Sequence, residues 1–489
     1  MKHAAVLMAV LVLLSGCGLV GPDYDRPPPA TPPTPEFKEM GFRPAQPSDT
    51  RDRGAWWMIY GDSELDQLTI QVEISNQTLK AAEAAYRQTR VLVRQSQSPL
   101  YSTIGYTGDA KQIGTGAQRG NGRFDSSQGQ FSAGATLTWE IDVWGRIRRT
   151  IESDSAAAQA SAADLAAARL SAQSSLITNY FSLRMSDQRR KILEESVAAY
   201  ARSMTIVANQ VTAGIVSRVD LVQAQTLYEQ TRAQLVNEGI ARAQFEHAIA
   251  ALIGKQPAEV AVAPAPPPES VPTVDAGVPS ALLERRPDIA SSERQMAAAN
   301  AQIGVAEAAF YPDFTLNASI GFVSTFLGTL FQLGSAVWSI GPQLAGTAID
   351  GGARSSQVES AKANYDRTVA NYRQTVLTAF QQVEDQLTQQ RILEQTEEVQ
   401  RAAVAAAREG ERLAFNQYRA GTVPYTTVIQ TQTAALGAEQ NLLTVRLNRL
   451  IASATLIVAL GGGWRNIDLP AAVPVLGIKD PPKKSWWPF

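Results

Sequence analysis

Cysteine, histidine and long apolar runs are all scarce in this chain of 489 residues. Cys17 is the only cysteine, so no disulfide can staple the fold and no cysteine-rich metal site can form. Apart from His3, the only histidine is His247, which is too few for an ordinary zinc site or a Ser-His-Asp triad. Beyond the N-terminal segment, no unbroken apolar run approaches the roughly 18 residues of a membrane-spanning helix. Charged residues make up 18% of the chain and the net charge is -2, which indicates neither disorder nor nucleic-acid binding.

The N-terminus has the features of an export signal followed by an acylation site. A charged start precedes an apolar run at residues 4–14, which is too short to cross a bilayer. The run Leu14-Ser15-Gly16-Cys17 resembles the bacterial lipobox, whose cysteine receives a diacylglycerol and becomes an N-acylated N-terminus. We therefore expect removal of residues 1–16, with diacylglycerol and N-palmitoyl groups on Cys17. Gly18, in place of Asp, resembles lipoproteins sorted to the outer membrane, whereas a plain signal with a chance cysteine is the alternative.

Proline-rich segments divide the mature chain. Residues 17–61 begin with the expected lipid site, and their proline-dense part predicts an extended tether that spaces the body from the membrane. A second proline-rich linker at 255–277 separates two longer segments, 62–254 and 278–462. The remaining residues, 463–489, form a basic, proline-containing tail that we expect to be poorly ordered.

The two longer segments carry the same signals about 208 residues apart. Asp142 and Arg146 recur as Asp350 and Arg354, each pair closing a strand candidate and opening a helix. The turn signal Ala213-Gly214-Ile215-Val216 recurs as Ala420-Gly421-Thr422-Val423, and Ala251-Leu252-Ile253-Gly254 recurs as Ala459-Leu460-Gly461-Gly462. Since this period is too long for a solenoid repeat, we expect an internal duplication that forms two halves of one body.

Each segment contains a pair of strand candidates with one apolar and one small polar face. Alternation is strict at residues 130–141, 314–322 and 336–344 and less regular at 100–107, with a polar, glycine-rich stretch at 105–129. Roughly 10 alternating residues match a tilted strand that crosses a bilayer with lipid outside and water inside. A half-buried sheet in a soluble sandwich would show the same alternation, but the near absence of charge in an exported chain favours the membrane.

Four strands per chain cannot close a barrel by themselves. Unpaired backbone groups at an open sheet edge cost several kcal/mol each in hydrocarbon. Further copies of the chain must therefore supply the missing strands, and a trimer would form a twelve-stranded β-barrel.

Most of the remaining sequence predicts long helices. A first helix is expected from Ser63 to about Ser98, and another from about Val278 to Ala309. Heptad spacing is typical of coiled coils, and it occurs in two stretches: Tyr365, Val369, Tyr372, Val376, Ala379 and Val383, and Leu436, Leu443, Leu450 and Ile457. The run from Arg146 to Gly214 would extend about 100 Å as one helix. The predicted fold class is therefore a mixed α and β membrane protein, with mostly long helices in a coiled-coil α-barrel.

Together these features resemble the TolC family of outer-membrane efflux factors, in its OprM/NodT-like lipoprotein branch. The resemblance also includes the run Leu283-Glu284-Arg285-Arg286-Pro287-Asp288 and the sequence Phe310-Tyr311-Pro312, and it covers essentially the whole mature chain. It implies a homotrimer with a β-barrel in the outer membrane and a helical barrel projecting into the periplasm. It also implies two partners, a periplasmic adaptor protein and an inner-membrane transporter of the resistance-nodulation-division type.

The resemblance further implies that the turns at Gly214 and Gly421 form the periplasmic entrance. In the family, charged and aromatic side chains at these turns hold the entrance shut. The gate candidates here are Arg218, Asp220, Tyr418, Arg419, Thr427 and Gln430. Thr427 and Gln430 stand where some members have acidic residues, so a double acidic ring is not expected. The alternative for any of these positions is a solvated end of a helical turn.

The sequence offers little support for catalysis. Gly254-Lys255 lacks the upstream glycine of a phosphate loop, so we expect no nucleotide site, no metal and no enzymatic activity. The expected function is a passive efflux duct driven by its inner-membrane partner. Two alternatives are the outer-membrane duct of a type I protein secretion system and a periplasmic adaptor lipoprotein. An adaptor would have one helical hairpin and no duplicated strands.

Overall fold

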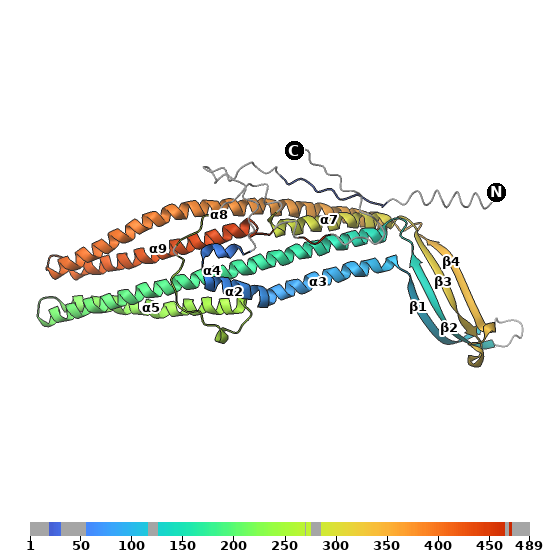
Figure 1. Ribbon diagram of the computed structural model, residues 1–489, viewed down its shortest axis with the longest axis horizontal. Helices are drawn as coiled ribbons and strands as arrows, with labels where there is room; N and C mark the ends of the chain where they lie inside the picture. The colour runs from blue at the N-terminus through green and yellow to red at the C-terminus, as the bar shows by residue number, and fades with distance from the viewer. Residues whose placement is uncertain are drawn as a thin grey trace.

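The computed structural model describes residues 19–30, 55–115, 126–268, 270–274, 285–464 and 469–471. The predictions for the signal peptide, for Cys17 and for the last 18 residues of the tail, 472–489, lie outside these ranges. The described chain is an elongated body of side-by-side helices, with a sheet extending from one end (Figure 1).

The order of elements repeats along the chain, with a helical segment, two strands, a long helix and a shorter helix in each half. The helices are η2 (Trp56–Tyr60), α2 (Ser63–Ser75), α3 (Gln77–Gln97), α4 (Arg146–Thr212), α5 (Arg218–Leu252), α7 (Pro287–Ala308), α8 (Ala353–Arg419) and α9 (Tyr425–Ala459). Short 3-10 turns are η3 (Ser98–Leu100), η4 (Pro257–Glu259), η6 (Leu327–Thr329) and η7 (Leu333–Ser335). Helices α4 and α8 have 67 residues each, and α5 and α9 have 35 each.

One of the predicted helices is divided in the structure. The single helix expected from Ser63 to Ser98 is divided at Asn76, whose side-chain oxygen accepts from the Leu79 backbone N–H at 3.0 Å and so caps α3. The amide of the same side chain donates to the Leu252 carbonyl at 2.7 Å, which ties the break to the end of α5. Of the helix predicted from about Val278 to Ala309, α7 covers Pro287–Ala308, and residues 278–284 lie outside the described ranges.

The strands form one antiparallel sheet in the order β1-β2-β3-β4. Their bounds are β1 (Thr103–Thr115), β2 (Ser126–Glu140), β3 (Asp313–Ser324) and β4 (Ala336–Ala345). The register confirms the predicted alternation, because Leu137 lies opposite Ile104 and Ala318, and Thr136 lies opposite Gly105 and Ser319. Among the described residues, β1 and β4 each pair on one side only, so the sheet has two open edges.

The predicted first strand was too short. The polar stretch assigned to a connection from residue 105 onward instead continues β1 to Thr115, and residues 116–125 lie outside the described ranges. The ladder pairs Asp109 with Ser132 and Lys111 with Gln130. Backbone pairing does not depend on apolar alternation, which explains why an alternation search missed this part of the strand.

The main core lies in the middle of the helical body. Trp56, Trp57 and Tyr60 of η2 are buried against Tyr180 and Phe181 of α4. The predicted heptad leucines of α9 are buried in the same cluster, which confirms that pattern. Among the described helices only α9 is long and apolar enough to cross a membrane by length and composition, and 44% of its most apolar window is buried within the chain. Its apolar character is accounted for by packing in this core.

Candidate functional site

The end of the helical body farthest from the sheet consists of two similar turns, which we call the tip (Figure 1). The α4 turn places Gly214 at a φ of 70°, with the Ile215 N–H bonded to the Gln210 carbonyl. The α8 turn repeats this geometry, with Gly421 at a φ of 74° and the Thr422 N–H bonded to the Gln417 carbonyl. Both are Schellman motifs, which end a helix with a glycine at a positive φ that other residues rarely tolerate. The two predicted Gly turns are therefore the sites at which the long helices reverse.

A small apolar cluster joins the two turns. Tyr418 and Tyr425 pack edge to face with ring centroids 5.0 Å apart, and Val207 of α4 and Ala224 of α5 are buried with them. The Tyr418 hydroxyl donates to the Gln210 Oε1 at 2.8 Å. Burial and the charge of Asp220 raise the pKa of Tyr418, and burial raises the pKa of Tyr425 to about 12, with the neighbouring Tyr418 and Asp220 adding to it. Both phenols are therefore neutral near pH 7.

The six gate candidates fall into two groups. Tyr418 is buried in the cluster, and Asp220 is close enough for its charge to influence both tyrosines. Arg218, Arg419 and Gln430 are exposed. Within the described part of this single chain, the side chains of Arg218, Asp220, Arg419, Thr427 and Gln430 make no hydrogen bond or ion pair to another residue. The structure thus brings Tyr418 and Asp220 together, leaves Arg218, Arg419 and Gln430 exposed, and half-buries Thr427.

Sequence reasoning missed Gln210 and Tyr425 at the tip. Gln210 lies four residues before Gly214, and Tyr425 is the first residue of α9. The duplicated turn could have identified them. When two equivalent turns pack together, residues at equivalent positions of the two repeats, such as Gln210 and Tyr418, can come into contact. Neither Gln210 nor Tyr425 belongs to a recognisable charge pattern, so the search for gate residues overlooked both.

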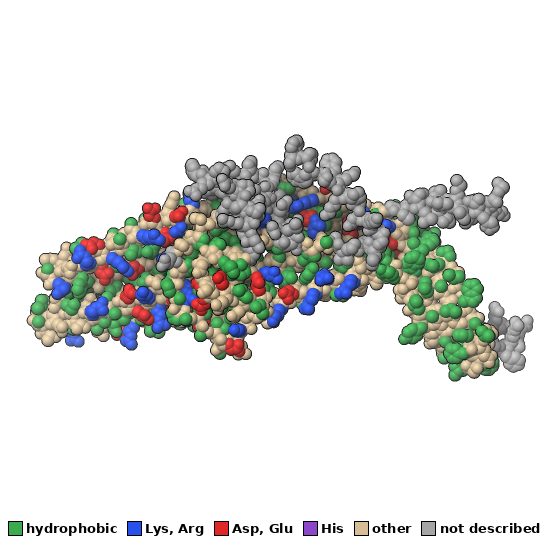
Figure 2. All heavy atoms as spheres, viewed as in Figure 1, with side chains coloured by type: hydrophobic (Ala, Val, Ile, Leu, Met, Phe, Trp, Pro, Cys, Tyr) green, Lys and Arg blue, Asp and Glu red, His purple; other side chains and the backbone are tan. Residues whose placement is uncertain are grey.

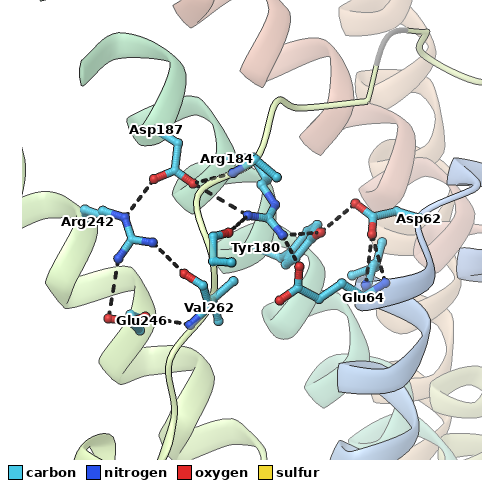
Figure 3. Close-up of polar contacts among 11 residues, drawn as sticks. Asp62, Glu64, Tyr180, Arg184, Asp187, Arg242, Glu246 and Val262 are labelled. Carbon is cyan, nitrogen blue, oxygen red and sulfur yellow. Dashed lines mark hydrogen bonds and ion pairs between the residues drawn. The ribbon is translucent and has the colours of Figure 1, made fainter. Parts of the chain in front are cut away.

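A buried ionic network surrounds Arg184 on α4, and we call it the belt (Figure 3). Arg184 is 1% exposed and contacts Glu64 of α2, the Tyr180 hydroxyl at 2.9 Å and the Ala263 carbonyl at 2.6 Å. Tyr180 in turn donates to Asp62 at 2.5 Å, and Asp62 caps the N-terminus of α2. The belt therefore joins α2, α4 and the proline-rich linker through one guanidinium.

Arg242 on α5 completes the belt. Its guanidinium binds Asp187 at 2.7 Å and the Val262 carbonyl at 2.6 Å, while Glu246 accepts from the Val262 N–H at 2.8 Å (Figure 3). Burying charges is favourable only when they are paired, and each charged group of the belt has an ion-pair or hydrogen-bond partner, although the Arg184 Nε has no hydrogen-bond partner among the described residues. The belt thus holds the linker after the first repeat against the α4–α5 hairpin.

The segment after the predicted lipid site is bound along the body near the sheet. The Arg149 side chain, 2% exposed, donates to the Val20 carbonyl at 3.1 Å and the Gly21 carbonyl at 3.0 Å and pairs with Asp23 at 2.9 Å. A Cβ on Gly21 would lie 2.3 Å from the Gly304 Cα, so the segment lies directly on α7. The buried arginine and the close glycine contacts thus fix this segment on the body, while the role of residues 17–61 as a tether that spaces the body from the membrane stays a prediction.

The described residues contain no group of three or more histidine, cysteine, aspartate or glutamate side chains that could hold a metal ion. His247 is exposed on α5. The surface colouring shows charged side chains spread over the helices, while apolar and uncharged atoms dominate the visible face of the sheet (Figure 2). The two ends of the described chain therefore differ chemically: the helical body carries charged side chains, and the visible face of the sheet is mostly apolar and uncharged.

Comparison with known proteins gives consistent matches over nearly the full length. The family model described as outer membrane efflux protein matches residues 68–255 and 278–462. The solvent efflux pump outer membrane protein SrpC of Pseudomonas putida is 31% identical over 479 residues, which cover 95% of this chain and 99% of that protein. The toluene efflux pump outer membrane protein TtgF of the same species is 30% identical over 485 residues, with coverages of 96% and 98%.

Solved structures are also similar. The outer-membrane channel OprN superposes with a TM-score of 0.84 at 27% identity, covering 91% of this chain and 99% of that one. The CmeC outer membrane channel of Campylobacter jejuni gives a TM-score of 0.85 at 23% identity, covering 92% and 96%. At that lower identity the likeness shows the fold alone.

Proposed function

This chain belongs to the outer membrane efflux protein family, and we propose that it forms a homotrimeric duct within a tripartite pump. In this proposal three copies share one twelve-stranded barrel in the outer membrane, and their helical bodies project into the periplasm. A periplasmic adaptor and an inner-membrane transporter of the resistance-nodulation-division type complete the pathway. Cys17 carries the diacylglycerol and palmitoyl groups that anchor each copy.

One observation carries the proposal, namely a sheet with two open edges and two chemically different faces. Ile104, Leu137, Ala318 and Ile340 lie in register on one face. On the other face Ser319 and Ser339 share a hydrogen bond of 2.8 Å, and Asn317 donates to Gln343 at 2.9 Å. An apolar exterior and a polar interior are what a water-filled barrel in lipid requires. Because open edges are not tolerated in hydrocarbon, β4 of one copy would pair with β1 of the next.

The tip supplies the proposed entrance. Tyr418, Gln210 and Tyr425 hold the two turns of a chain together, which narrows the end of a three-chain assembly. Arg218, Arg419 and Gln430 are exposed and have no side-chain partner among the described residues of their own chain, so they are available to a neighbouring copy or to the adaptor. The gating role of these residues is part of the proposal.

The named relatives favour efflux over the alternatives. SrpC and TtgF are named for solvent and toluene efflux, so we expect the cargo to be small molecules handed over by the pump, not polypeptides. The described residues contain two helical hairpins, α4–α5 and α8–α9, whereas the adaptor alternative required one. We propose that the chain has no enzymatic activity of its own and that the inner-membrane partner drives transport.

Reconstitution tests this function directly. The purified, acylated protein is expected to run as a trimer that dissociates on heating and to conduct ions across planar lipid bilayers. Expression in a strain that lacks its own efflux duct, together with the cognate adaptor and pump, should restore resistance to a pump substrate. The heat-dissociated preparation serves as the matched control and should not conduct. A monomer that neither conducts nor restores resistance would overturn the proposal.

A further inference from the structure

The connection between β3 and β4, residues 325–335, is apolar and exposed, and we call it the β3–β4 loop. It contains no charged residue. Four of its large apolar side chains are largely open to the surroundings: Phe326 at 72%, Leu327 at 65%, Phe331 at 73% and Leu333 at 94%. Soluble surfaces rarely gather so much exposed apolar area on one short segment, and such patches mark an interaction surface.

The loop folds toward the apolar face of the sheet. The ring of Phe331 packs edge to face on Phe322, with centroids 5.6 Å apart. Phe322 lies opposite Ala133 and Ala336, in the register of the apolar side chains. Ala133, Ala135, Ile320, Phe322 and Phe331 line an open hollow of about 350 Å³ on this side. The loop is therefore on the side of the barrel that faces lipid, away from the polar interior.

Much of the polar backbone of the loop is hydrogen-bonded within the loop itself. Thr329, Leu330, Gln332 and Ser335 each donate a backbone N–H to a carbonyl within the loop, at 2.9 to 3.3 Å. The Ser335 hydroxyl donates to the Thr329 carbonyl at 2.9 Å, and the Thr329 and Ser324 hydroxyls share a bond of 2.6 Å. Segments that leave water for lipid must bond their polar groups internally, and the two 3-10 turns of this loop do so.

The first hairpin of the sheet, β1–β2, differs from the second in its length and in its charged residues. β3 ends at Ser324 opposite Phe131, whereas β2 begins earlier, at Ser126, so the first hairpin reaches farther from the helical body. Its outer part carries Asp109 and Lys111, and the sequence between its strands adds Arg119 and Arg123. The first hairpin has the composition of a segment in water, and the second has that of a segment in contact with lipid.

We propose that the β3–β4 loop is a membrane-binding surface that lies among the lipid acyl chains of the outer leaflet. Its apolar side chains then extend the apolar band of the barrel at the end farthest from the helices, as interfacial aromatic and aliphatic side chains do in outer-membrane barrels. The loop does not hang in water or fold across the pore. The inference rests on the proposed function, because it requires the sheet to be in the outer membrane.

Site-directed spin labelling tests the loop separately from the barrel. Acylation blocks Cys17, so a single introduced cysteine is the only site for a nitroxide, and the unmodified protein should take up no label. Leu333→Cys and Phe326→Cys report on the loop. Ile340→Cys and Ser339→Cys are matched controls, since these neighbours on β4 point to the apolar and polar faces. The labelled trimers are placed in liposomes and exposed to oxygen, which partitions into lipid, or to a water-soluble nickel complex.

We expect Leu333→Cys and Phe326→Cys to collide mainly with oxygen, as Ile340→Cys does, while Ser339→Cys collides mainly with nickel. Loop labels that respond to nickel while Ile340→Cys responds to oxygen would overturn the loop proposal and leave the duct intact. An Ile340→Cys label that responds to nickel would overturn the duct itself. Each variant is first checked for formation of the heat-dissociable trimer. Two loop positions are labelled so that the test can still be made if one of the two variants does not assemble.

Discussion

Helix α4 is held in two different ways along its length. At the belt, Arg184 is 1% exposed and binds a backbone carbonyl and the side chains of Glu64, Tyr180 and Asp187. Beyond Tyr200, the described residues hold the same helix only through the apolar cluster around Val207 and one hydrogen bond from Tyr418 to Gln210. A continuous helix is thus fixed firmly in the middle and lightly at its end.

The two kinds of contact differ in free energy. Hydrogen bonds that involve a charged group, such as those of Arg184 to the half-exposed Glu64, are typically worth about 1.5–3 kcal/mol. A neutral hydrogen bond contributes about 1 kcal/mol, and an aromatic pair about 0.5–1.5 kcal/mol beyond its burial. The two helical turns of the tip can therefore move apart at a free-energy cost that is too small to break the belt. The proposed entrance requires this difference.

The largest effect is expected from Arg184→Met, which leaves Glu64 without its buried partner. Because Glu64 is itself 39% exposed, the assembled protein should lose about 1.5–3 kcal/mol of stability, the typical worth of hydrogen bonds made by a charged group. The measurement is the temperature at which the heat-dissociable trimer is lost. Arg190→Met is the matched control on the same helix, because Arg190 is more than half exposed and pairs with the exposed Glu194. Its loss should be about 0–1 kcal/mol. Equal dissociation temperatures for the two variants would contradict the contrast between belt and tip.

A smaller effect is expected from Tyr418→Phe, which keeps the ring but removes the hydrogen bond to Gln210. A loss of about 1 kcal/mol from the closed tip would raise the ratio of open to closed channels about fivefold. Single-channel recording in planar bilayers measures the open fraction. The trimer dissociation temperature should stay at its original value, because the belt is untouched. A lower dissociation temperature without more open time would place Tyr418 among the stabilising contacts of the body.

The two charged gate candidates should have a smaller influence on the closed tip. Asp220→Ala and Arg419→Ala are each expected to enlarge basal conductance, because neither side chain has a hydrogen-bond or ion-pair partner among the described residues of its own chain and each would pair only between copies. Exposed ion pairs are typically worth about 0–1 kcal/mol and are screened by salt. The increase should therefore shrink relative to the unmodified channel at high ionic strength. Conductance that stays unchanged in both variants would remove these residues from the gate.

The sequence predicted those features that repeat, and it missed those that depend on a single contact. Alternation located the parts of the strands that have an apolar face, and heptads located the buried side of α9, because both patterns recur along an element. The end of β1 was missed because it pairs through its backbone alone. The division at Asn76 depends on a carbonyl of Leu252 far along the chain, which no local pattern reveals.

The candidate site shows the same limit. Gly214 and Gly421 were identifiable because a turn at the end of a long helix requires a residue that tolerates positive φ. Tyr418 was identifiable by its position beside the turn, but its partner Gln210 lies 208 residues away. Binding of residues 19–26 by Arg149 was not predictable, since an arginine within a helix is usually solvated. Contacts between distant segments are specified by the packed fold.

The smallest expected effect concerns pH at the middle of the body, between belt and tip. Glu411 lines a hollow of about 340 Å³ with Glu195, Arg408 and Glu439. Burial raises the pKa of Glu411, and the charge of Glu439 adds to it, although Arg408 opposes the shift. Glu409, two residues earlier on α8, is exposed and bonded to Arg412, which lowers the pKa of that carboxyl. The two glutamates therefore respond to pH in opposite directions.

For Glu411 the folded protein favours the protonated acid. Its stabilising contribution is complete below the ordinary glutamate pKa of about 4.3 and is lost as pH rises through the raised value. Glu411→Gln, which stays neutral, should therefore raise the dissociation temperature at pH 7 and lose this advantage as the pH is lowered toward 4. Glu409→Gln should show the opposite sign, with no gain at pH 7, because a carboxyl with a lowered pKa stabilises the fold only above its ordinary range. Parallel pH profiles for the two variants would mean that the hollow beside Glu411 is as well hydrated as the outer surface.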